Sequence, residues 1–223
     1  MPAWAMAGAL VAYNNFRPEL GPVSYVGVNS LVGIALGGIA LRTFGSDARE
    51  LGLVGNRPRV VLAAGSAAVA LALPLFALAA FDSTAPFVAD ERVAGLDGRQ
   101  IAFQALIRIP IGTALFEEFA FRGVLFGLFS RRGSRFGAVA SSIAFGLWHI
   151  RPTVEVIEAN TGDPSPAAVG FLVGAAVVAT GLVGAGLCWL RRRGGGVAAP
   201  CAFHAVMNSL ALVAATVAHR NAG

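Results

Sequence analysis

Residues 115–129 read L-F-E-E-F-A-F-R-G-V-L-F-G-L-F and place two adjacent carboxylates and an arginine inside an otherwise apolar run. A charged side chain at the centre of a bilayer costs roughly 2.5 to 3.5 kcal/mol on insertion scales, so such residues face a protein interior or a wet cavity. Glu118 and Arg122 are one helical turn apart and are predicted to pair, whereas Glu117 points about 100° away. One of the two carboxylates is therefore predicted to remain for chemistry.

The composition of the chain is that of a polytopic membrane protein. Of 223 residues, 56% are hydrophobic and 13% are charged, which excludes an ordinary soluble domain. The net charge of +5 rests on arginines that are grouped in short loops between apolar segments. This grouping indicates membrane topology, so we expect the lipid bilayer as a partner and no nucleic acid.

Seven apolar segments predict an all-α fold, a polytopic transmembrane helical bundle with about seven membrane segments. They cover about residues 3–16, 23–41, 60–81, 107–129, 136–150, 167–190 and 197–218. A span needs roughly 20 residues, so the first and fifth segments are short. No boundary between domains is visible, and we expect residues 1–223 to form a single integral membrane domain.

The loops between the segments alternate in charge. Arginines gather in residues 42–59, 130–135 and 191–196, whereas acidic residues predominate in loops 82–99 and 151–166. The positive-inside rule places the arginine-rich loops in the cytoplasm. We therefore expect a multi-pass protein of the cell membrane with a cytoplasmic amino terminus and a carboxyl terminus outside.

Two local patterns give weaker predictions. Gly33 and Gly37, and likewise Gly170 and Gly174, have a four-residue spacing that lets helices approach closely. Residues 47–53 fit either a short amphipathic helix on the inner membrane surface or a solvated turn, and the sequence favours neither.

Side chains that can take part in catalysis recur in the later segments. His149 ends the fifth segment, and His204 lies four residues before Asn208, so that these two side chains share one helical face. A histidine beside a carboxylate can deprotonate water, and a histidine with an amide can stabilise an oxyanion. Each residue alone fits a structural role equally well, in an ion pair or an interhelical hydrogen bond.

Taken together, three motifs resemble those of a known family, the CAAX protease and bacteriocin-processing (CPBP) family of intramembrane endopeptidases. The family is also described as abortive-infection or type II CAAX prenyl proteases. Its motifs Glu-Glu-x-x-x-Arg, Phe-x-x-x-His and His-x-x-x-Asn stand here, in the same order, as Glu117-Glu118-Phe-Ala-Phe-Arg122, Phe145-Gly-Leu-Trp-His149 and His204-Ala-Val-Met-Asn208. The resemblance covers about residues 105–215.

The resemblance implies a glutamate-dependent endopeptidase that needs no metal. By this resemblance, Glu117 and His149 activate the water that attacks a peptide carbonyl. His204 and Asn208 hold the oxyanion that forms. The implied substrate is a peptide or protein, which we expect to be membrane-associated.

Three residues of the motifs are expected to support these four. Arg122 orients the glutamates, and Glu118 and Phe145 complete the motifs. We expect no cofactor. A glutamate with two histidines can in principle bind zinc, but the chain has no His-Glu-x-x-His motif.

Two other classes of function stay open: an ion- or proton-coupled transporter, and a non-catalytic membrane immunity or scaffold protein that retains the motifs. A protease needs its polar residues around one pocket, whereas a proton relay strings them along a path. Glu117 lies mid-segment, His149 at the outer end of its segment and His204 near the inner end. Convergence therefore requires the short fifth segment to be tilted or sunk from the cytoplasmic side.

Asn208→Asp tests the oxyanion role, because it keeps the side chain's shape but replaces the amide donor with a group that repels negative charge. We expect kcat to fall at least as far as in Asn208→Ala, about 10²- to 10³-fold, with KM nearly unchanged in steady-state kinetics. A change confined to KM, or full activity, would remove Asn208 from this role. A transporter would instead gain cation affinity.

Overall fold

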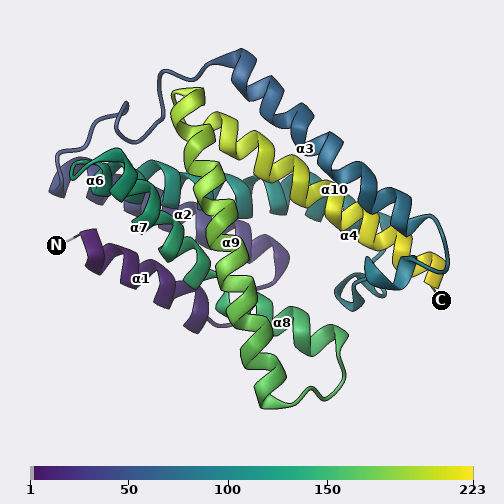
Figure 1. Ribbon diagram of the computed structural model, residues 1–223. Coiled ribbons are helices and arrows are strands. Elements are labelled where there is room, and N and C mark those ends of the chain that lie inside the picture. Colours follow the sequence, from purple (N-terminus) through teal and green to yellow (C-terminus); the bar gives the residue numbers. More distant parts are fainter. Residues whose placement is uncertain (1–2, 223) are drawn as a thin grey trace.

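The computed structural model describes residues 3–222 and contains helices but no strand within them, which confirms the predicted all-α class (Figure 1). Separate helices frame the molecule: α1 (Ala3–Phe16), α2 (Pro22–Thr43), α3 (Pro58–Ala79), α7 (Ser134–Trp148), α8 (Ile150–Asn160), α9 (Pro166–Gly194) and α10 (Ala198–Ala222). Two 3-10 turns, η1 (Ala85–Phe87) and η2 (Glu91–Val93), follow α3.

Residues 98–130 form one continuous helical run, which we call the central helix. Its parts are α4 (Gly98–Phe103), η3 (Gln104–Leu115), α5 (Phe116–Glu118), η4 (Phe119–Leu125) and α6 (Phe126–Ser130). A capping box begins it, because the Asp97 and Gln100 side chains each accept a hydrogen bond from the other's backbone amide. Its η3 and η4 parts have π-helical geometry, which is frequent at functional sites.

The other helices surround the central helix. Helices α2 and α10 pack against η3, and α7 packs against α6 and η4. Apolar side chains of the central helix, such as Phe121 and Leu125, join residues of α1, α2 and α7 in the main hydrophobic core. Helix α10 packs along α3, and α9 crosses α7 at Gly146, where an added Cβ would lie 2.5 Å from the Val177 carbonyl oxygen.

The arginine-rich loops lie together at one end of the molecule, which we call the arginine-rich end. The Arg131 guanidinium donates to the Phe44 carbonyl at 2.9 Å and so joins the loop after α6 to the loop after α2. The Arg57 amide donates to the Gly194 carbonyl at 2.8 Å and adds the end of α9. The predicted grouping of these loops is therefore present.

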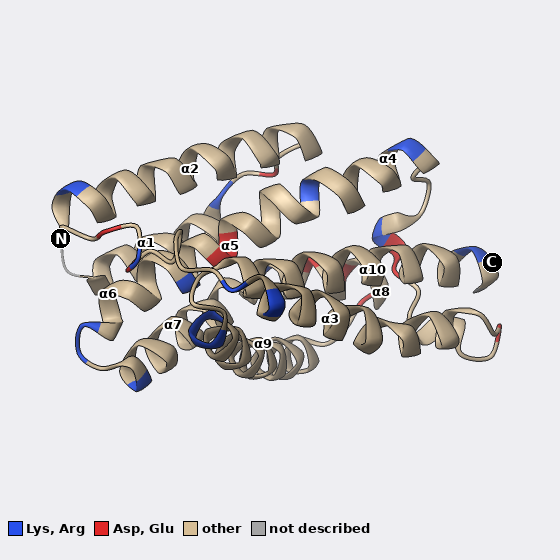
Figure 2. Ribbon diagram, turned by 90° about the horizontal axis from the view of Figure 1, so that it is seen from above, with Lys and Arg blue, Asp and Glu red and all other residues tan. Residues whose placement is uncertain are grey.

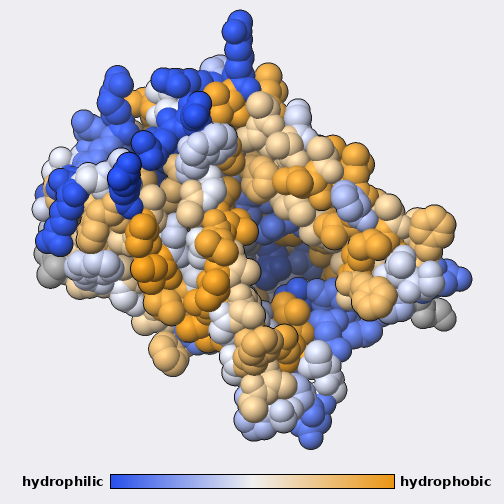
Figure 3. Space-filling model, in the orientation of Figure 1, coloured by the Kyte–Doolittle hydropathy of each residue, from blue (hydrophilic) through white to orange (hydrophobic). Residues whose placement is uncertain are grey.

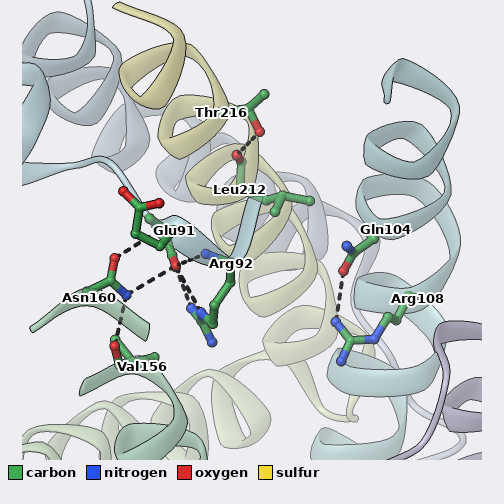
Figure 4. Close-up of polar contacts among 9 residues, drawn as sticks. Glu91, Arg92, Gln104, Arg108, Val156, Asn160, Leu212 and Thr216 are labelled. Carbon is green, nitrogen blue, oxygen red and sulfur yellow. Dashed lines mark hydrogen bonds and ion pairs between the residues drawn. The ribbon is translucent and has the colours of Figure 1, made fainter. Parts of the chain in front are cut away.

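At the opposite end, hydrogen bonds join the loop after α3 to α8. The Asn160 side chain accepts a hydrogen bond from the Glu91 amide at 2.9 Å and donates to Asp90 at 3.3 Å, while Asp90 also binds Arg92 (Figure 4). The start of α1 and the end of α10 lie at opposite ends of the molecule (Figure 2).

Helix α8 occupies part of residues 151–166, where only a loop was predicted. Arg151 and Glu155 form an i,i+4 ion pair at 2.7 Å on its surface. The loop prediction was wrong because charged residues mark the exposed side of a helix as well as a loop.

Residues 47–53 form consecutive turns and no amphipathic helix. They press onto the central helix at Gly123, where an added Cβ would lie 2.9 Å from the Leu51 carbonyl oxygen. Arg191 at the end of α9 secures this contact, because its guanidinium donates to the Glu50 carbonyl at 3.1 Å. Backbone contacts with the central helix and α9 thus hold this segment in turns.

One of the two glycine pairs brings helices together. Gly33 and Gly37 face the central helix, and an added Cβ at Gly37 would lie 3.2 Å from the Phe119 ring. Gly170 and Gly174 of α9 face open space, with no atom within 4 Å of an added Cβ. The spacing therefore predicted a close approach correctly for the first pair and wrongly for the second.

Within the described residues, α2, α3, α9 and α10 are long and apolar enough to cross a membrane. Helices α1 and α7 have 14 and 15 residues and are the two short segments that the sequence predicted. A helix the length of α7 extends about 22 Å, less than the roughly 30 Å of a bilayer's hydrocarbon core. Helix α7 is thus too short to cross the core, and His149 follows directly at its end.

Glu50→Gln tests the contact between the loops at the arginine-rich end. Hydrogen bonds from Arg131, at 2.5 and 2.7 Å, lower the pKa of the Glu50 carboxyl below its usual value near 4.5. Because the folded pKa is depressed, the stabilisation is present above the unfolded pKa and is lost as the pH falls through the folded pKa. We expect the variant to melt below wild type at pH 7, by about 0.2 to 1 kcal/mol for this partly exposed pair.

The measurement is thermal unfolding of the detergent-solubilised protein between pH 7 and pH 3. The control is Glu19→Gln, an exposed residue with no ion pair among residues 3–222. The gap between Glu50→Gln and wild type should close at acid pH. A gap that stays constant with pH would contradict the ion-pair explanation.

Candidate active site

Polar side chains from three helices meet in the middle of the bundle. Glu117 and Glu118 lie on α5, which is red at the centre of Figure 2, and both are buried. Arg122 follows on η4, His149 links α7 to α8, and His204 lies in the first part of α10. The short α7 ends just before His149, whose half-buried ring packs against Phe145. The convergence of His149 with Glu117 and His204 around one substrate stays a prediction.

Glu118 is the centre of a buried charge network. Its Oε1 atom accepts a hydrogen bond from the Arg122 guanidinium at 3.1 Å and one from His204 Nδ1 at 2.8 Å. Glu118 and Arg122 have no exposed surface. The predicted pairing is therefore present, and it also recruits a histidine from 86 residues further along the chain.

Arg122 is held on its other side by an aromatic ring. Its guanidinium carbon lies 3.9 Å from the centroid of the Phe145 ring, a cation–π contact. Helix α9 closes over the pair at Gly184, where an added Cβ would lie 3.1 Å from the Arg122 guanidinium and 3.2 Å from Phe145. Phe145 therefore supports the charge network through packing.

Glu117 has a different partner from its neighbour. Its Oε1 atom accepts a hydrogen bond from the Trp148 indole at 3.1 Å, while its buried Oε2 atom has no hydrogen-bond partner among the described residues. The indole is itself fixed, because the Asn14 side chain donates to the Trp148 carbonyl at 2.7 Å and the ring packs against Phe121. Glu117 therefore keeps one carboxylate oxygen free.

The hydrogen bond made by His149 fixes the position of its proton. Nδ1 lies 2.7 Å from the Phe145 carbonyl oxygen, and a carbonyl oxygen can only accept, so Nδ1 carries the hydrogen. In the neutral ring Nε2 then bears the lone pair. The His149 ring also packs edge-on against Phe145, with centroids 4.5 Å apart.

His204 is constrained in the same way by Glu118. An ionised carboxylate only accepts, so Nδ1 donates to Glu118 and a neutral ring presents Nε2 as an acceptor. Nε2 becomes a donor only when the ring is protonated. Asn208 follows one turn later on α10, half-buried, and its side chain makes no hydrogen bond within residues 3–222.

The structure joins some predicted site residues directly and leaves others apart. Glu118, Arg122 and His204 form one bonded unit, and Phe145 touches Arg122, His149 and His204. Within the described residues, Glu117 and His149 share no hydrogen bond. Figure 3 shows a hollow with a hydrophilic floor between α9 and α10, so polar groups inside the bundle are open to the surface.

Glutamate and histidine, which lie close together here, are residue types that can bind zinc. Among residues 3–222, no three side chains of His, Cys, Asp or Glu are arranged to hold a metal ion. The expected independence of a metal stays a prediction.

A family model described as Type II CAAX prenyl endopeptidase Rce1-like matches residues 99–210. The match covers half of the chain and includes all three motifs. The chain belongs to this family. The members of this family are endopeptidases. Because four of the described helices are long and apolar enough to cross a membrane, this chain is a protease of the integral membrane class. No curated protein and no solved structure matches the chain.

Two residues of this Rce1-like chain that shape the site escaped prediction. Trp148 occupies a spacer position in the motif that ends at His149, and Asn14 lies outside the residues that the family model matches. A signal existed for Trp148, since a buried indole N–H requires a partner. Nothing local identified Asn14, because its partner lies 134 residues away.

Arg122→Ala tests the buried charge network, because it strands the Glu118 carboxylate without its guanidinium. We expect the variant to lose roughly 3 to 5 kcal/mol of stability and to be extracted in low yield. The matched control is Arg192→Ala, an exposed arginine of α9. Adding Glu118→Gln to Arg122→Ala should recover part of the loss by removing the stranded charge. Wild-type melting of Arg122→Ala would contradict the pairing.

Proposed function

We propose that the protein is an intramembrane glutamic endopeptidase that hydrolyses a peptide bond without a metal. Glu117 and His149 activate water for attack on the peptide carbonyl, and His204 and Asn208 stabilise the resulting oxyanion. The observation that carries this proposal is the difference between the two adjacent glutamates. Glu118 is paired through Oε1 with the side chains of Arg122 and His204, whereas Glu117 accepts one hydrogen bond, from the neutral Trp148 indole. In both carboxylates Oε2 is buried and has no partner among residues 3–222.

Glu117 suits the role of general base in this scheme. The Trp148 indole fixes one oxygen of the carboxylate, so the other is held ready to accept a proton from water. His149 can share the task through Nε2, because its Nδ1 hydrogen is committed to the Phe145 carbonyl. Since these two residues share no hydrogen bond, the attacking water would lie between their free acceptor atoms.

The oxyanion role sets a condition on His204. Its Nδ1 hydrogen is donated to Glu118, so Nε2 can donate to an oxyanion only from the imidazolium form. Asn208 requires no such condition, because its amide is a donor at any pH and has no competing partner among the described residues.

The arrangement favours a protease over a proton relay. Phe145 touches Arg122, His149 and His204, so the polar residues surround one aromatic ring and do not extend along a path. The proposed substrate is a membrane-associated peptide or protein that enters through the hollow between α9 and α10. The arginine-rich end, with the amino terminus, is proposed to face the cytoplasm.

Glu117→Gln provides the decisive experiment. We expect cleavage to fall by about 10²- to 10⁴-fold, the usual range for losing a general base, while the protein stays folded. Trp148→Phe should lower kcat more than KM, because the ring is kept but Glu117 loses its fixed orientation. Membrane peptides from cells that express wild type or Glu117→Gln identify the substrate, whose cleavage is then measured with purified protein.

The matched control is Glu158→Gln on α8, an exposed carboxylate outside the three motifs. It should cleave like wild type. Near-normal turnover in Glu117→Gln would reject the proposed mechanism, and identical membrane peptides from wild-type and variant cells would favour a non-catalytic protein.

A further inference from the structure

A second cavity lies between α3 and α9 and is lined by a different set of residues from the polar cluster. It is an apolar groove of about 480 Å³, within the range of small-molecule sites. Its lining includes Val60, Ala64 and Ala67 of α3, Leu187 and Trp189 of α9, and Phe203 of α10. No charged residue contributes to this lining.

Arginines stand at one end of the groove. Arg59 immediately precedes Val60, the first lining residue of α3. The Arg193 guanidinium lies 5.3 Å from the centroid of the Trp189 ring, and the Arg57 guanidinium donates to the Arg193 carbonyl at 3.2 Å. Trp189 lines the groove, so the Arg193 guanidinium lies against a residue of the groove lining.

These arginines lack acidic partners. Arg131 pairs with Glu50, but Arg57, Arg59 and Arg193 form no ion pair with any residue from 3 to 222, and all three are exposed. Figure 3 shows hydrophilic side chains above apolar surface where α9 ends and α3 begins. A cluster of unpaired guanidinium groups beside a membrane-embedded groove matches a lipid phosphate.

We propose that this groove binds one anionic phospholipid, with an acyl chain between α3 and α9 and the phosphate at Arg57, Arg59 and Arg193. An apolar lining suits an acyl chain and offers no partner to the amides of an extended peptide. Phe203 lines the groove and directly precedes His204. A bound chain would therefore brace α10 beside the charge network. This proposal does not depend on the proposed proteolysis.

The test uses the full-length protein, delipidated in detergent and offered equal amounts of phosphatidylglycerol and phosphatidylcholine with the same acyl chains. We expect native mass spectrometry to show one retained phosphatidylglycerol per chain, preferred at least tenfold over phosphatidylcholine. Phosphatidylglycerol should also raise the melting temperature. Inorganic phosphate should not reproduce this rise, because it lacks the acyl chain.

Two kinds of variant separate the groove from the arginines. Gly186→Leu fills the groove, since Gly186 lines it and an added Cβ there meets no atom within 4 Å. Its matched control is Gly174→Leu, an equally open glycine of the same helix outside the groove. Both variants keep every charge, so only Gly186→Leu should lose the lipid, by at least tenfold.

The arginine variant combines Arg57→Gln, Arg59→Gln and Arg193→Gln. Its control combines Arg132→Gln in the loop after α6 with Arg135→Gln at the start of α7. We expect the first to abolish the preference for phosphatidylglycerol and the second to keep it. Equal retention of both lipids by wild type, or an equal loss in Gly174→Leu, would overturn the proposal. Should Gly186→Leu fail to fold, Ala67→Leu fills the same groove and carries the same test.

Discussion

The buried carboxylate of Glu118 is the interaction on which the rest of the structure depends. Removing charge from water costs several kcal/mol per ion, and only close pairing with further hydrogen bonds offsets that cost. Glu118 obtains both on one oxygen, from Arg122 one turn along the central helix and from His204 on α10. Because Arg122 also rests on Phe145 of α7, this one carboxylate sets the positions of the three helices that carry the motifs.

The helical geometry of the central helix gives the adjacent glutamates separate partners. A rotation of about 100° per residue turns Glu118 toward α10 and leaves Glu117 against the aromatic wall that Trp148 and Phe121 form. One environment saturates a carboxylate oxygen with cationic donors, and the other supplies a single neutral donor. Two identical side chains thus differ in the charge of their partners because of their direction alone.

Arginine stabilises this fold in three distinct ways. The Arg122 guanidinium compensates the buried charge of Glu118. The buried guanidinium of Arg191 donates to the backbone carbonyls of Arg122 and Glu50, and so it joins α9 to the central helix and to the turns after α2. Arg131 joins two loops through Glu50 at the surface. The remaining exposed arginines at this end, including Arg193, form no ion pair among residues 3–222. The same residue type therefore lies in the core, at the loop contacts and on the exposed surface.

The sequence by itself determined the helical class, the bounds of the apolar segments to within a few residues except at the start of the central helix, the grouping of loops by charge and the Glu118–Arg122 pair. These features depend on local composition and on spacings of one helical turn, which a chain carries in any fold. Tertiary structure decided which face each element buries. Gly33 and Gly170 begin identical spacings, yet only Gly33 lies against another helix. The charge-rich residues 151–160 form most of α8. Trp148 donates a hydrogen bond to Glu117, and Asn14 donates one to the Trp148 carbonyl. Such outcomes depend on partners distant in the chain, and no local pattern encodes a contact whose other half is set by how the helices pack.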